Sequence, residues 1–125
     1  MRPRVLLIDD YRDLVSAWRR VLEPSCEIVG GASNGSDGLS LAASLNPDVI
    51  VLDYYMPGLS GVELCEELKR IAPSARIVLT TAGDIDRIRE SVAGLGLTAI
   101  VPKYAGAAEL KRAIHSAYLG TEVAP

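Results

Sequence analysis

The chain has 125 residues, with 13 Lys and Arg against 16 Asp and Glu and a formal net charge of −3. That length is typical of one domain, and the acidic balance argues against direct nucleic-acid binding, which usually needs a basic surface. No apolar run approaches the ~20 residues that span a bilayer, so we expect one domain over residues 1–125, no membrane contact and a cytoplasmic location.

The chain has few cysteine and histidine side chains, the residues that most often bind zinc or serve as nucleophile and base in hydrolases. Its two cysteines, Cys26 and Cys65, lie far apart in the sequence, and His115 is the single histidine. These residues cannot build a disulfide framework or a zinc site, and they leave little material for a Ser-His-Asp or Cys-His enzyme. We expect both cysteines to be buried, reduced thiols.

Short apolar runs rich in β-branched residues recur along the chain and predict strands buried on both faces. Helical periodicity separates them, with the second helix the weakest. In chain order, the predicted strands cover 5–8, 26–29, 49–52, 77–79 and 99–101. The apolar helix faces comprise Leu14, Trp18, Val21 and Leu22; Leu39, Leu41, Ala42, Ala43 and Leu45; Leu64, Cys65, Leu68 and Ile71; Ile85, Ile88, Val92 and Leu95; and Leu110, Ile114 and Ala117.

Capping residues support these helices. Ser60 stands three residues before Glu63, the spacing of a capping box, and Ser36 or Asp37 can cap the second helix. Five alternating strand–helix units require right-handed crossovers. The pattern therefore predicts an α/β fold, a doubly wound five-stranded parallel sheet with helices on both faces.

Polar side chains gather where the predicted strands end, and the functional crevice of an open parallel sheet lies at that edge. Each residue has an ordinary explanation by itself: Asp10 can cap a helix, Asp53 can be a loop residue and Lys103 a surface lysine. None of these explanations accounts for their common location. The residues that follow the strands are Asp9 and Asp10, Asp53, Thr80 and Thr81, and Lys103.

This combination of residues suits phosphoryl transfer. Clustered carboxylates raise one another's pKa and are best tolerated around a cation. Oxygen ligands without nearby His or Cys favour Mg²⁺, which uses one or two carboxylates plus water and phosphate oxygens. A third carboxylate is then free to act as a nucleophile, while a lysine and a threonine hydroxyl hold phosphoryl oxygens.

These residues resemble the receiver domains of two-component response regulators over essentially the whole chain. The matching motifs, in order, are Leu-Leu-Ile-Asp9-Asp10, Asp53-Tyr-Tyr-Met-Pro-Gly with Gly61 three residues on, Ile-Val-Leu-Thr-Thr81-Ala, and Pro-Lys103. The resemblance implies a CheY-like, flavodoxin-like (βα)5 fold with strand order 2-1-3-4-5.

The resemblance also implies roles for individual residues. Asp53 would be the phosphoacceptor, and Lys103 and Thr81 would contact the phosphoryl group. Thr81 is preferred over Thr80 because the two point opposite ways along a strand. Asp9 and Asp10 would bind Mg²⁺ together with Asp53 and the backbone carbonyl of Tyr55. Such a domain is no enzyme in the usual sense, because it catalyses only its own phosphorylation and dephosphorylation.

Partners follow from the same resemblance. The phosphoryl donor would be a sensor histidine kinase. The stretch from Leu110 to Pro125 is similar to NarL/LuxR-type receivers, in which this helix leads through a linker to a DNA-binding output domain. The sequence leaves open whether this chain is part of such a protein or a stand-alone receiver, and whether it forms a homodimer.

Two departures and three alternatives accompany this hypothesis. Ile100 stands where relatives often carry a rotating aromatic switch, and the nearby Tyr104 is interpreted as a surface tyrosine. Tyr55 and Gly83 occupy positions that tune hydrolysis in the family. A receiver-like module that works without phosphorylation stays open, as does a small aspartyl-phosphate phosphohydrolase, although adjacent Asp9-Asp10 departs from the Asp-x-Asp of haloacid dehalogenases. A flavodoxin is disfavoured because the first loop is too acidic to hold a flavin phosphate.

Overall fold

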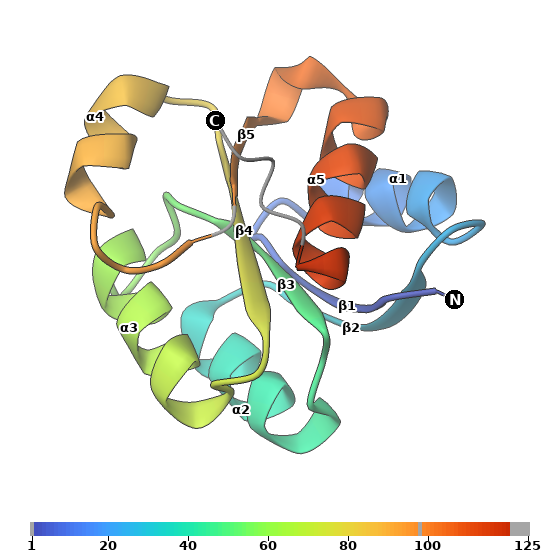
Figure 1. Ribbon diagram of the computed structural model, residues 1–125, viewed down its shortest axis with the longest axis horizontal. Coiled ribbons are helices and arrows are strands. Elements are labelled where there is room, and N and C mark those ends of the chain that lie inside the picture. The colour runs from blue at the N-terminus through green and yellow to red at the C-terminus, as the bar shows by residue number, and fades with distance from the viewer. Residues whose placement is uncertain (1, 98, 121–125) are drawn as a thin grey trace.

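The protein contains one parallel sheet, seen in a computed structural model that describes residues 2–97 and 99–120 (Figure 1). Its strands are β1 (Arg4–Ile8), β2 (Glu27–Ala32), β3 (Val49–Asp53), β4 (Arg76–Thr81) and β5 (Ala99–Pro102). They pair in the order β2-β1-β3-β4-β5, and every pairing is parallel. The predicted doubly wound sheet and its strand order are confirmed.

Helices cover both faces of the sheet. They are α1 (Arg12–Leu22), α2 (Gly35–Leu45), α3 (Gly61–Ile71), α4 (Ile85–Ser91) and α5 (Ala107–Leu119), with a 3-10 turn, η1 (Lys103–Ala105), before α5. Figure 1 shows α1 and α5 on one face and α2, α3 and α4 on the other. Within the described part of the chain, no helix is long and apolar enough to cross a lipid bilayer.

The core has two halves because successive strand residues point to opposite faces of the sheet. In β1, Leu6 and Ile8 pack toward the α2, α3 and α4 side, whereas Val5 and Leu7 pack toward α1 and α5. All four are at most 1% exposed. This two-sided burial holds the strand ends, and thus the polar residues beyond them, at one edge.

Helix α4 is shorter than its apolar stripe predicts. The stripe extends through Val92 to Leu95, but the helix covers only Ile85–Ser91. Gly94 and Gly96 have φ of 88° and 69°, the left-handed conformation that helices do not continue through. Val92 and Leu95 therefore pack on the core from a turn instead of from a helix.

Two predictions about helix faces and caps were wrong. Asn34, not Ser36 or Asp37, caps α2: its side chain accepts a hydrogen bond from the backbone N–H of Asp37 at 2.8 Å. Asp37 in turn accepts one from the Asn34 side-chain amide at 3.0 Å. In α1, Val21 is 45% exposed and faces away from the core that Trp18 and Leu22 enter. By contrast, the Ser60–Glu63 capping box is present as predicted.

Both cysteines are free and buried, as predicted. Burial raises the pKa of the Cys65 thiol to about 12, and burial also raises the pKa of Cys26. Because the thiolate is the reactive form, neither cysteine will react with a disulfide reagent at pH 8 while the protein is folded. Thiol titration before and after unfolding in guanidinium chloride checks this, and rapid labelling of the native protein would contradict it.

Candidate functional site

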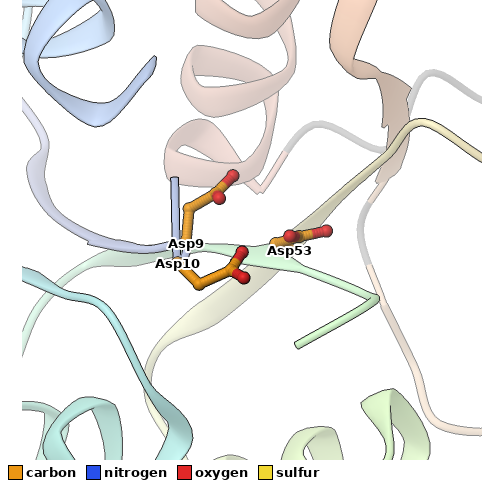
Figure 2. Close-up of side chains that lie close together, drawn as sticks. All are labelled: Asp9, Asp10 and Asp53. Carbon is orange, nitrogen blue, oxygen red and sulfur yellow. The ribbon is translucent and has the colours of Figure 1, made fainter. Parts of the chain in front are cut away.

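Three carboxylates meet at the carboxyl edge of the sheet. Asp9 and Asp10 follow β1 and Asp53 ends β3, and one carboxylate oxygen from each residue lies within 4.8 Å of the others (Figure 2). The strands β1 and β3 are direct neighbours, so residues at their ends emerge side by side. Asp9 and Asp53 are 1% and 4% exposed, whereas Asp10 faces solvent.

A lysine from the far side of β4 completes this cluster. Lys103 follows β5, and its Nζ lies 2.9 Å from Asp9 Oδ2 and donates a hydrogen bond to Asp53 Oδ2 at 3.0 Å. Its side chain is 17% exposed. The site therefore brings three carboxylates to one ammonium group, which leaves an excess of negative charge at this edge.

Burial is the largest single influence on the pKa of both Asp53 and Lys103. Burial raises the pKa of Asp53, the nearby Asp9 charge raises it further, and the hydrogen bonds from Lys103 and the Tyr55 backbone only partly offset this. For Lys103, burial by itself lowers the pKa, but its contacts with Asp9 and Asp53 outweigh it and raise the pKa overall. A second cation would relieve the remaining repulsion between the carboxylates.

The donor set fits a hard divalent cation. Mg²⁺ prefers carboxylate, carbonyl and water oxygens, and the cluster offers oxygens alone. Asp9 Oδ2 is also buried and accepts no hydrogen bond from the described residues, although it lies beside the Lys103 ammonium. A buried carboxylate oxygen of this kind is a ready metal ligand.

Asp10 does not serve as a helix cap. The N-cap of α1 is Tyr11, which makes no side-chain capping bond. The Tyr11 backbone N–H instead donates to Asp9 Oδ1 at 2.9 Å, which fixes one oxygen of Asp9. Asp10 therefore lies exposed at the solvent side of the cluster, and the alternative interpretation of Asp10 as a helix cap is wrong.

The loop after β3 shapes one wall of the site. Tyr55 N–H donates to Asp53 Oδ1 at 3.2 Å, so the residue whose carbonyl is the expected metal ligand also orients the acceptor. Tyr54 turns inward onto the first residue of α3, Gly61, where a Cβ would fall 2.5 Å from the Tyr54 ring. Only glycine allows this approach, which explains Gly61 in the motif.

Tyr55 and Gly83 meet across the site. The Tyr55 side chain is 58% exposed and lies over Gly83, where an added Cβ would fall 2.7 Å from its ring. The loops after β3 and β4 are therefore in contact beside Asp53. The sequence singled out both positions separately; their contact could not be inferred, because it depends on how the two loops fold.

The two threonines that end β4 have different surroundings. Thr80 is the register partner of Asp53, and its hydroxyl is buried without a hydrogen-bond partner among the described residues. Thr81 is fully buried, and its hydroxyl accepts a hydrogen bond from the Gly83 N–H at 2.9 Å. The sequence analysis preferred Thr81 to Thr80 for contact with the phosphoryl group. The place of Thr80 opposite Asp53 in the sheet was not predicted.

Residue 100, three positions before Lys103, carries no aromatic switch. Ile100 is partly buried and packs on the core beneath α4. Tyr104 is 80% exposed, as expected for a surface tyrosine. A ring that moves between buried and exposed positions is therefore absent from residue 100.

Comparison with known protein families identifies the family of this chain. The family described as "Response regulator receiver domain" matches residues 5–115. This chain belongs to that family. It is 34% identical to the nitrate/nitrite response regulator protein NarL of Escherichia coli K12 over 121 residues, 95% of this chain and 56% of that protein. It is 38% identical to the transcriptional regulatory protein LiaR of Bacillus subtilis over 120 residues, 94% of this chain and 56% of that protein.

Solved structures of receivers share the fold. The signal receiver domain of a NarL regulator from Mycobacterium tuberculosis superposes with a TM-score of 0.87 at 27% identity, covering 96% of this chain and 98% of that one. The chain spans about half the length of the curated relatives it matches, 56% in each case. The likeness therefore covers the receiver part of these relatives and does not extend to the rest of their length.

Proposed function

We propose that this receiver accepts a phosphoryl group on Asp53 in a Mg²⁺-dependent reaction and passes the change to an output surface. The observation that supports this most is the cluster itself: three carboxylates at neighbouring strand ends, with Lys103 bridging Asp9 and Asp53. Residues 1–125 would act as a single receiver domain, catalysing only its own phosphorylation and dephosphorylation.

Asp53 is the carboxylate best placed to be the nucleophile. In the transfer, an Asp53 carboxylate oxygen bonds to phosphorus while the phosphorus–nitrogen bond of a phosphohistidine breaks. The bond pair stays on the imidazole nitrogen, which leaves as neutral imidazole when its other ring nitrogen carries a proton. Tyr55 N–H and Lys103 Nζ hold the Asp53 carboxylate in place before transfer.

Asp9, Asp10, Asp53 and the Tyr55 carbonyl would hold Mg²⁺. When bound, the ion neutralises charge on the cluster and on the phosphoryl oxygens. The residues of this chain do the rest: Lys103 can turn from Asp53 to a phosphoryl oxygen, and Thr81 can offer its hydroxyl to another. The Thr81 hydroxyl now accepts a hydrogen bond from the Gly83 N–H, and it can still donate its own proton to a phosphoryl oxygen.

The partners belong to the same proposal. The donor would be a sensor histidine kinase, with small phosphoryl donors such as acetyl phosphate as substitutes. LiaR is a transcriptional regulatory protein, and this chain matches about half of it. A DNA-binding output domain outside these 125 residues would explain that difference in length. A homodimer would be one way for the receiver to transmit its state.

Two alternatives predict different results. A module that works without phosphorylation would keep the fold but ignore phosphate analogues, and the partly buried Ile100 in place of an aromatic switch gives it some support. A small phosphohydrolase would turn over phosphomonoesters steadily. Against the first, the three carboxylates and the lysine that phosphoryl transfer would use are all present. Against the second, Asp9 and Asp10 are adjacent instead of forming Asp-x-Asp, and the candidate nucleophile Asp53 lies on the third strand.

Beryllofluoride, an analogue of an aspartyl phosphate, tests the proposal. With Mg²⁺ it will change the fluorescence of Trp18, the single tryptophan of the chain, or the amide NMR spectrum around Asp53. No change will occur without Mg²⁺ or in the Asp53→Asn variant. A full response without Mg²⁺, or an undiminished response in the variant, would contradict the assignment of Asp53.

We expect the response to extend from Thr81 into α4 and β5. Helix α4 has only 7 residues, and the turn after it contains two glycines with positive φ, so its packing is easily shifted. Amide hydrogen exchange with and without beryllofluoride should change over residues 84–97 and 99–101. A change confined to the loops around Asp53 would rule out this output surface. Because Ile100 cannot rotate a ring into the gap, the shift should be smaller than in relatives with an aromatic switch.

A further inference from the structure

A second hollow lies beside the carboxylate cluster, between α1 and the loop from β2 to α2. It has a volume of about 430 Å³, within the range of small-molecule sites. One wall is α1, which contributes Arg12, Ser16 and Arg19. The opposite wall contributes Ser33 and Asp37. Neither wall is needed for the chemistry proposed at Asp53.

The floor of this hollow is open because residue 31 is a glycine. Arg19 Nη2 lies 3.8 Å from the point where a Cβ on Gly31 would stand, so the guanidinium group folds down over the strand. The φ of Gly31 is not in the left-handed region, and its nearest would-be Cβ contact is 3.6 Å, to Val15. A side chain would therefore fit the backbone here and would occupy the floor of the hollow, against Val15 and Arg19.

The α1 wall carries positive charge. Arg12, Ser16 and Arg19 stand four and three residues apart, a spacing that places them on one helix face over about 10 Å. Neither arginine forms an ion pair with another described residue. Asp9 also lines the hollow, but it already contacts the Lys103 ammonium. The two guanidinium groups are thus available to an anion, and their planar forks suit phosphate oxygens.

The opposite wall suits hydroxyl groups instead. Asp37 accepts one hydrogen bond, from the Asn34 side-chain amide at 3.0 Å, and its second carboxylate oxygen is left to accept another. Its negative charge would repel a phosphate but would bind an alcohol. Ser33 and Ser16 can donate or accept on either side.

We propose that this hollow binds a small phosphorylated polyol, with its phosphate between Arg12 and Arg19 and its hydroxyl groups toward Ser33 and Asp37. The site is separate from the phosphoacceptor, although Asp9 borders both. A sugar phosphate of five or six carbons has a phosphate group for the two arginines at one end and hydroxyl groups for Ser33 and Asp37 at the other. The proposal does not depend on phosphorylation of Asp53.

Titration of the labelled protein with ribose 5-phosphate, followed by amide NMR in EDTA, tests the proposal. Saturable shifts should map to residues 12–19 and 31–37. Inorganic phosphate and ribose, each supplying one half of the ligand, should bind at least about tenfold more weakly. Equal affinity for inorganic phosphate would overturn the polyol assignment, and shifts centred on residue 53 would overturn the separate site.

Three variants sharpen this test. Arg19→Met should weaken ribose 5-phosphate binding about tenfold or more, whereas Arg20→Met, in the same turn but exposed and outside the hollow, should not. Gly31→Val places a side chain on the floor of the hollow, beside the Arg19 guanidinium, without changing the charge and should abolish binding. Thermal unfolding of each variant establishes that it is folded. An equal loss in Arg20→Met, or normal binding in Gly31→Val, would overturn the proposal.

Discussion

Asp53→Asn will take up no phosphoryl group from acetyl phosphate in the presence of Mg²⁺, whereas the wild-type protein will take up at most one. Asparagine keeps the size and the hydrogen-bond acceptor that Lys103 contacts, but its amide oxygen is a far weaker nucleophile than a carboxylate. Intact-protein mass spectrometry measures the uptake. Asp13→Asn is the matched control, because it removes one exposed carboxylate charge outside the cluster and leaves the nucleophile and the metal ligands in place.

The Asp53→Asn variant will have a higher free energy of unfolding than the wild type in Mg²⁺-free solution at neutral pH, because the wild type must keep a buried carboxylate charged beside Asp9. Burial and the Asp9 charge raise the pKa of Asp53 above its ordinary value of 3.8. A raised pKa means that the stability linked to this carboxyl is present below 3.8 and is lost as the pH rises through the folded-state pKa. The neutral amide avoids that loss, so the variant's advantage should vanish in acid.

Urea unfolding in EDTA at pH 7 and at pH 3.5 measures this difference. Mg²⁺ should reverse the order of stability at neutral pH, because the wild type keeps all three carboxylates and binds the ion more tightly. The resulting stabilisation grows with the logarithm of the Mg²⁺ concentration once that exceeds the dissociation constant. A variant that is less stable than the wild type in EDTA at pH 7 would show that the Lys103–Asp53 pair outweighs the repulsion among the carboxylates.

Much of this molecule was predictable because buried strands leave a clear pattern. The order and direction of the strands follow from alternating units, and the residues at the strand ends follow from the strands. The meeting of Asp9, Asp53 and Lys103 could be predicted for this reason, although Lys103 has to reach past β4. To predict that these three residues meet, it was enough to know the fold class and where three strands end.

Features that depend on loop conformation were less predictable. The end of α4 is set by backbone conformation at Gly94 and Gly96, and an apolar stripe continues through them unchanged. The cap of α2 shifted to Asn34 because several neighbouring residues can cap equally well. The hollow over Gly31 is even harder to foresee, because it results from a missing side chain facing a helix from elsewhere in the sequence.

Lys103→Met will destabilise the Mg²⁺-free protein by about 2–4 kcal/mol. Removing one partner of a buried ion pair leaves the other charge uncompensated, which typically costs about 3–5 kcal/mol. Here two partners, Asp9 and Asp53, lose their cation, but the 17% exposure of the Lys103 side chain reduces the cost. Methionine preserves the aliphatic stem, so the loss reports on the ammonium group. Lys69→Met, at an exposed position on α3, should change stability by less than about 0.5 kcal/mol.

Mg²⁺ will restore most of the lost stability of Lys103→Met, because the ion supplies the positive charge that the cluster lacks. The variant should therefore still accept a phosphoryl group in Mg²⁺, since Asp53 and the other carboxylates remain. Its structural response should be lost, because the variant has no ammonium group to leave Asp53 for a phosphoryl oxygen and draw β5 with it. Hydrogen exchange of the phosphorylated variant over residues 84–97 separates the two steps. If the phosphorylated variant and wild type show the same exchange there, Lys103 does not transmit the signal and serves only to hold the carboxylates together.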